Sequence, residues 1–263
     1  MMELYAPVRR PVIAALLAGT VLMASGAMAQ GTGPHAKADW PLPVHDDVSN
    51  GQMMLDRFEY QEADDGEDPF LWDGQAWYGG DTHRLLVESE GEAVVSGGDG
   101  GELENFDVQY ANRFSAFWDL KAGLGYQTTF GSGPDEDRAS ALIGIQGLAP
   151  QWFEVDANLR VSEDGDTVAE VEGEYDWLLT QRLIVQGRGE SSVAFNEVPE
   201  FGVGEGVNDL TLGLRLRYEF SREIAPYVGV RWRKDLGDTA DLSRDEGEDT
   251  ESSAVVAGVR WWF

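Results

Sequence analysis

The chain has 263 residues, which is room for one large domain or two small ones. It carries 48 Asp and Glu against 19 Lys and Arg, for a formal net charge of -29, and it has no cysteine. This composition excludes disulfides, iron–sulfur clusters and thiolate zinc sites, and so negative a charge argues against binding to nucleic acid. With 42% hydrophobic and 11% aromatic residues, the chain is also too apolar to be a disordered acidic protein.

The first 29 residues predict a secretory signal peptide. Arg9 and Arg10 form its positive start, residues 11–26 form an apolar stretch, and an Ala-Met-Ala cleavage site follows at residues 27–29. A membrane anchor is the weaker alternative, because the stretch is short and ends in small residues. Residues 30–51 then predict a short periplasmic N-terminal segment marked by proline, and no later run approaches the ~20 apolar residues of a membrane-spanning helix.

From residue 52 to the end, apolar and polar residues alternate with a period of two, which is typical of strands. In the clearest run, residues 210–220, Leu212, Leu214 and Leu216 fall on one face. Arg215 and Arg217 fall on the other. Twelve such segments are predicted, at residues 52–63, 69–80, 83–95, 102–115, 117–130, 138–150, 152–164, 167–179, 182–194, 206–220, 224–236 and 252–263.

The connections between these segments alternate in length, which favours an outer-membrane barrel. Those after the even-numbered segments are tight, whereas those after the odd-numbered ones are longer, acidic and rich in glycine, such as residues 64–68 and 237–251. Aromatic residues lie near the tight-turn ends, as at a membrane interface, and the chain ends on the aromatic Phe263. We therefore expect an all-β, transmembrane, antiparallel outer-membrane β-barrel of twelve strands over residues 52–263. The alternative, a soluble β-sandwich, predicts no such difference between loops.

If one face of each strand meets lipid, the alternate residues line an enclosed lumen. The acidic lining is predicted on the seventh and eighth segments, at Glu154, Asp156, Glu170, Glu172, Glu174 and Asp176. The basic lining is predicted on the last three segments, at Arg215, Arg217, Arg231, Arg233 and Arg260. Two alternatives remain: an open pore for ions and small solutes, or a lumen filled by ion pairs, since buried charges need partners.

Histidine placement argues against an enzyme and indicates a metal site instead. His35 and His45 precede the barrel, and His83 lies at a tight turn, so no second strand brings a histidine base to the side of the long loops. Met53 and Met54 begin the first strand near the same periplasmic rim as His83, and His45 lies just upstream. Thioether and imidazole together suit copper, so these four are candidate copper ligands. The alternative is that the methionines fill gaps and His83 caps a turn.

Short motifs spread in order from about residue 40 to the end carry a family resemblance. They include Trp40-Pro-Leu-Pro-Val44, Asp56-Arg-Phe-Glu-Tyr60, Trp77-Tyr-Gly-Gly-Asp81, Leu212-Gly-Leu-Arg-Leu-Arg-Tyr218 and Ala225-Pro-Tyr-Val-Gly-Val230. With them the chain resembles the outer-membrane copper resistance protein B family. That resemblance implies a role in copper tolerance and homeostasis, copper binding, and a periplasmic multicopper oxidase nearby. It does not extend to the methionine- and histidine-rich tract of such proteins, because residues 30–50 hold no methionine and two histidines.

The sequence therefore predicts a non-enzymatic barrel in outer-membrane lipid. Acidic loops and lumen carboxylates are expected to attract copper ions, and Met and His groups at the periplasmic mouth to hold them briefly. Two alternatives stay open: a general small-solute channel without metal selectivity, and a docking protein for a periplasmic copper oxidase.

Overall fold

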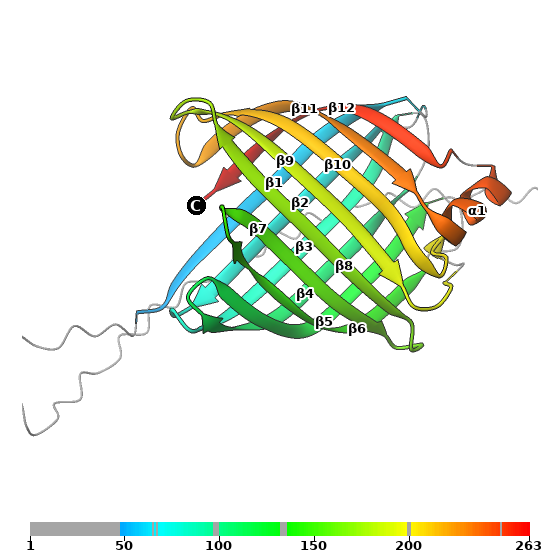
Figure 1. Cartoon of the computed structure of the whole chain (residues 1–263), viewed down its shortest axis with the longest axis horizontal. Coiled ribbons are helices and arrows are strands. Elements are labelled where there is room, and N and C mark those ends of the chain that lie inside the picture. Colours follow the sequence, from blue (N-terminus) through cyan, green and yellow to red (C-terminus); the bar gives the residue numbers. More distant parts are fainter. Residues whose placement is uncertain are drawn as a thin grey trace, which may run out of the picture. The chain divides into compact units, whose positions relative to one another are not determined.

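The computed structural model describes residues 48–263 except 65, 67, 97–99, 132–135, 199, 200 and 248 (Figure 1). The predicted signal peptide, most of the predicted N-terminal segment and the candidate ligand His45 lie outside the described residues. These three expectations therefore stay predictions.

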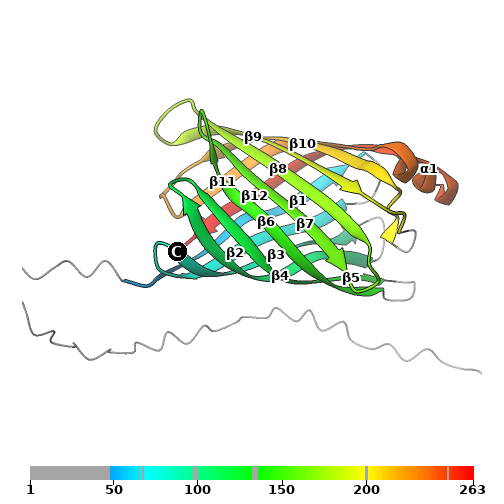
Figure 2. The ribbon, with the colours of Figure 1, turned by 60° about the horizontal axis from the view of Figure 1, so that its bottom comes forward.

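Twelve antiparallel strands close into one barrel in which each strand pairs with its neighbours in the chain and β12 pairs with β1 (Figures 1 and 2). The strands are β1 (Asn50–Ala63), β2 (Asp68–Gly79), β3 (His83–Ser96), β4 (Gly100–Ser115), β5 (Trp118–Gly131), β6 (Asp137–Ala149), β7 (Phe153–Ser162), β8 (Thr167–Leu178), β9 (Leu183–Ala194), β10 (Gly206–Tyr218), β11 (Ile224–Asp235) and β12 (Glu251–Trp262). The predicted fold class is confirmed, and each predicted segment matches one strand.

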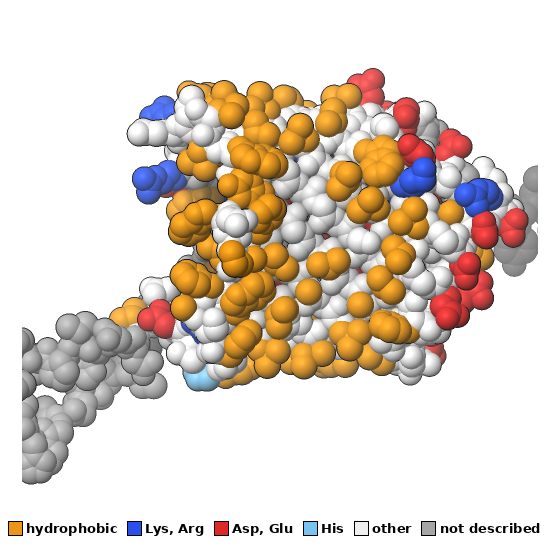
Figure 3. Space-filling model, viewed as in Figure 1, with side chains coloured by type: hydrophobic (Ala, Val, Ile, Leu, Met, Phe, Trp, Pro, Cys, Tyr) orange, Lys and Arg blue, Asp and Glu red, His pale blue; other side chains and the backbone are white. Residues whose placement is uncertain are grey.

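The outer surface of the barrel is apolar and the inner surface is charged, as the period of two requires. On β10, Leu214 is 50% exposed, whereas its neighbour Arg215 is 3% exposed. Figure 3 shows hydrophobic side chains across the outside of the barrel, most densely toward the end opposite α1. A soluble sandwich would place these leucines in a core, so this alternative is wrong.

The two ends of the barrel differ in their connections. At the end where β1 begins and β12 finishes, the hairpins are tight. The β6–β7 turn is an example, with Gln151 and Trp152 both at φ 70°. Positive φ at two central residues gives a tight hairpin the twist of its strands. At this end, the first and last strands of the barrel are joined by two backbone hydrogen bonds between Met53 and Phe263, both 3.0 Å long.

At the other end, the predicted acidic loop after β11 contains a helix, α1 (Gly237–Glu246), which the sequence analysis did not predict. Gly247 ends the helix in the left-handed region at φ 85°, where glycine is favoured. Thr239 accepts a hydrogen bond of 2.9 Å on its hydroxyl from the backbone N–H of Gly204, which ties α1 to the β9–β10 connection. Within the described part of the chain, no helix is long and apolar enough to cross a bilayer.

Candidate functional site: the charged lumen

A bulge in β1 brings two charged side chains inside the barrel at consecutive positions. The register of β1 shifts between Leu55 and Arg57 against β2, and between Leu55 and Glu59 against β12. Phe58 is therefore outward and Arg57 is buried in the interior at 2% exposure, while Asp56 contacts Arg260 inside the barrel. The extra inward residue concentrates charge at the middle of β1.

Two buried arginines, Arg57 and Arg188, connect opposite walls of the lumen. Arg57 on β1 donates to Asp73 at 3.0 Å, to Glu190 at 3.2 Å and to Glu90. Arg188 on β9 pairs with Glu174 at 2.9 Å, Asp73 at 3.2 Å, Glu172 and Glu190. Because Asp73 and Glu190 each contact both guanidinium groups, the two arginines form one network that spans the barrel.

A second pair of buried cations lies on the wall made by β5 and β7. Lys121 contacts Asp156 at 2.6 Å and Glu88 at 3.2 Å. Arg160 donates two hydrogen bonds of 2.9 Å to the carboxylate of Asp107. Gly125 makes room for this pair, since a Cβ there would lie 2.4 Å from a guanidinium nitrogen of Arg160. Ion pairs therefore cross the lumen, which is a feature of one of the two alternatives for its interior.

All eleven side chains predicted to line the lumen lie inside the barrel. Eight of them line its cavity: Glu154, Asp156, Glu170, Glu172, Glu174, Arg231, Arg233 and Arg260. The other three, Asp176, Arg215 and Arg217, lie outside the cavity lining and are held in ion pairs. Arg217 contacts Asp176 at 2.6 Å, and Arg215 contacts Glu59 at 2.9 Å.

Sequence reasoning missed most of the charged partners on the other strands. Glu88 and Glu90 were recognisable from the alternation of β3, since they sit two residues apart on its inward face. The inward position of Arg57 could not be recognised in this way, because strict alternation would place it on the outer face and the bulge turns it into the lumen. The pairing of Arg188 with Asp73 was not predictable either, since it depends on which walls of the barrel face each other.

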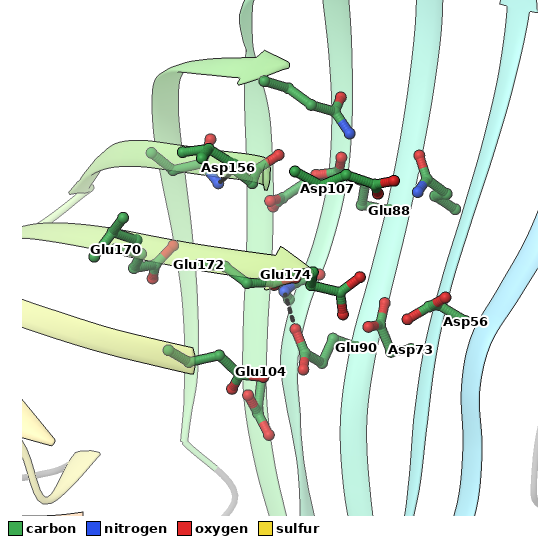
Figure 4. A pocket seen from close by; sticks show the side chains of 18 of the residues that line it. Asp56, Asp73, Glu88, Glu90, Glu104, Asp107, Asp156, Glu170, Glu172 and Glu174 are labelled. Carbon is green, nitrogen blue, oxygen red and sulfur yellow. Dashed lines mark hydrogen bonds between the residues drawn. The ribbon is translucent and has the colours of Figure 1, made fainter. Parts of the chain in front are cut away.

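Despite the ion pairs, the lumen encloses a cavity of about 760 Å³ whose lining runs from Met54 and Trp77 at the tight-turn end to Phe201 at the other. Sixteen Asp and Glu side chains line it, against eight Arg. Figure 4 shows carboxylates from β1, β2, β3, β4, β7 and β8 directed toward one space, among them Asp73, Glu90 and Glu172. The cavity is therefore a water-accessible space with an excess of negative charge.

The predicted copper ligands do not share one face. Met54 lines the cavity, and its Sδ accepts a hydrogen bond of 3.2 Å from Arg260. Met53 points outward and is 41% exposed. His83 is exposed at the tight-turn end, where its Nδ1 lies 2.9 Å from the amide nitrogen of Asn112.

The strand register also separates the methionines from His83 along the barrel. Met53 pairs with Ala76 on β2, which pairs with Val87 on β3, four residues along the strand from His83. At about 3.3 Å per residue, this offset is roughly 13 Å. Within the described residues, no three His, Asp or Glu side chains are arranged as a metal site. A rim site built from Met53, Met54, His83 and His45 stays a prediction.

A family model and two curated proteins similar to this chain all carry the name copper resistance protein B. The family model described as Copper resistance protein B precursor (CopB) matches residues 49–263. Copper resistance protein B of Escherichia coli and a Copper resistance protein B homolog of Pseudomonas syringae pv. tomato are each 38% identical over 222 residues, covering 84% of this chain and 72% of theirs.

Solved structures with a similar arrangement include two porins. A NanC porin has a TM-score of 0.49 and 13% identity, and a KdgM porin has a TM-score of 0.45 and 12% identity, each covering 80% of this chain and 98% of the other. The closed barrel with an apolar outer surface is an outer-membrane protein, and the chain belongs to the copper resistance protein B family.

Proposed function

We propose that the barrel binds copper ions in its lumen and passes them across the outer membrane, without catalysing a reaction. Membership of the copper resistance protein B family supports a role in copper resistance. The observation that carries the proposal further is the cavity, which has twice as many carboxylates as guanidinium groups along its wall. A negative field inside a narrow, low-dielectric wall raises the local concentration of cations.

Met54 supplies the chemistry that separates copper from other cations in this proposal. It lines the cavity beside Arg260 and Asp56, near the tight-turn end. Thioethers favour Cu(I), whereas carboxylates suit hard cations such as Mg²⁺ and Ca²⁺. Copper ions would therefore collect along the carboxylates and bind briefly at Met54. Passage across the membrane requires that each of these contacts is weak enough to release the ion.

The test is copper entry into liposomes that contain the purified barrel and an enclosed copper indicator. We expect entry well above that of empty liposomes, and Met54→Leu to lower it by roughly five-fold, or about 1 kcal/mol of binding free energy. Met53→Leu is the matched control, since Met53 is the neighbouring methionine and points outward.

Other results would support the alternatives. Entry of an uncharged sugar at the rate of copper, with no effect of Met54→Leu, would favour a general small-solute channel. A folded barrel that passes no copper but binds a purified periplasmic multicopper oxidase would favour a docking protein.

A further inference from the structure

Charged side chains form a ring around the lumen at mid-depth, linked by ion pairs and by neighbouring positions on the strands. Lys121 joins Glu88 on β3 to Asp156 on β7, and Asp156 is the direct cross-strand neighbour of Glu172 on β8. From Glu172 the ion pairs continue through Arg188, Glu190 and Arg57 to Glu90. Glu90 lies on β3 two residues from Glu88, where the ring began. We call Glu88, Glu90, Asp156, Glu172 and Glu190 the ring carboxylates.

The cations of this ring lie behind its carboxylates. The side chains of Lys121, Arg57 and Arg188 are 1%, 2% and 4% exposed. The five ring carboxylates are between 19% and 31% exposed, from Glu90 at the lower end to Glu172 at the upper. An ion in the cavity at this level therefore contacts carboxylate oxygens, while the ammonium and guanidinium groups are buried between the carboxylates and the barrel wall.

The ring also has more acceptors than donors. Five carboxylates face three cations, and the neighbouring amides do not correct the excess. Gln109, Asn105 and Asn158 each donate a side-chain N–H to a ring carboxylate, namely Glu88, Glu90 and Asp156. Their own amide oxygens are buried and accept no hydrogen bond from any described residue.

This arrangement is unfavourable unless positive charge enters from the cavity. Asp156 and Glu172, as well as Glu172 and Glu190, are like charges directly opposite each other on paired strands. Such pairs destabilise a sheet. Buried amide oxygens without donors add a desolvation penalty. A mobile cation in the cavity offsets the repulsion between the carboxylates, since it is attracted to their exposed oxygens.

We propose that the lumen is selective for cations and that the ring carboxylates are its filter. Lys121, Arg57 and Arg188 are positioning residues, which hold the carboxylate oxygens toward the cavity. The inference rests on the proposed passage of ions through the lumen, but it concerns the sign of the charge and not the identity of the metal. It can therefore fail or hold independently of copper passage.

The test uses potassium chloride gradients across planar bilayers that contain the barrel, with no copper present. From the reversal potential we expect the wild-type barrel to pass K⁺ over Cl⁻ by about ten-fold, since a focused field raises counter-ion concentration by this order. Asp156→Asn with Glu172→Gln should lower that ratio at least about three-fold. This double variant removes a direct repulsion, and Lys121 and Arg188 keep other carboxylate partners.

Glu62→Gln is the matched control, because Glu62 pairs with the outward Val255 on β12 and faces away from the lumen. It should leave the ratio unchanged. If the double variant fails to fold, the single change Glu172→Gln carries the same expectation with a smaller effect. A wild-type ratio near or below one, equal ratios in wild type and folded variant, or a folded barrel without ion conductance would each overturn the inference.

Discussion

Glu59 shows how completely a single side chain can be satisfied inside the barrel. It is fully buried, and it accepts hydrogen bonds from two nitrogens of Arg215 at 2.9 and 3.0 Å and from the hydroxyl of Tyr227 at 2.9 Å. Arg215 is itself 3% exposed. The pair connects β1 to β10 across β11 and β12, next to the seam where the first and last strands meet.

Removing the carboxylate of Glu59 should be strongly destabilising. Glu59→Ala leaves the guanidinium of Arg215 buried without its charge partner, and we expect the free energy of unfolding to fall by about 3–5 kcal/mol. Urea unfolding of the detergent-solubilised barrel, followed by tryptophan fluorescence, measures the change. The control is Glu59→Met with Arg215→Met, which removes both charges and should recover most of the loss. A loss below about 1 kcal/mol in Glu59→Ala would contradict the importance of this pair.

At the scale of elements, the position of helix α1 depends on the close approach of Gly204 to its first turn. A Cβ on Gly204 would lie 2.3 Å from the backbone nitrogen of Thr239, at the start of α1. Gly204→Ala should therefore displace α1 and speed amide hydrogen exchange in residues 238–246 by about ten-fold, because local opening becomes easier while the strands are untouched. Gly80→Ala is the control, since no atom lies within 4 Å of its Cβ position. Unchanged exchange in α1 would show that the β9–β10 connection does not hold the helix.

The elements also show what could be predicted from the sequence and what could not. β10 was predictable because Leu212, Leu214 and Leu216 alternate with inward polar residues, so the pattern of one strand decides its own orientation. The bulge in β1 was not, because strict alternation from Leu55 would place Arg57 toward lipid. Its true side depends on the register of β1 against both neighbours. α1 lies in an acidic stretch with little apolar periodicity, and the burial of Ala240 depends on contacts that this stretch alone does not reveal.

At the scale of the whole molecule, negative charge gathers in two zones. One is the rim at the end of α1, where Figure 3 shows acidic side chains clustered on the surface. The other is the lumen, where carboxylates outnumber guanidinium groups two to one. The predicted lumen residues lie in this second zone, but the partner of each charge follows from barrel closure, which no single strand encodes. Both zones attract cations, so selectivity alone does not separate them.

Salt concentration separates the two zones, because exposed and enclosed charges are screened differently. The Debye length falls from about 10 Å at 0.1 M salt to about 3 Å at 1 M, so rim charges lose their influence on ions at the mouth. An ion in the filter lies in direct contact with carboxylate oxygens, where little salt can intervene. We therefore expect the K⁺ over Cl⁻ ratio at 1 M potassium chloride to stay within about two-fold of its value at 0.1 M. Asp238→Asn with Asp245→Asn, both on α1, should alter the ratio at 0.1 M more than at 1 M. A wild-type ratio that falls to one at 1 M would assign the selectivity to the rim, since enclosed carboxylates would have kept it.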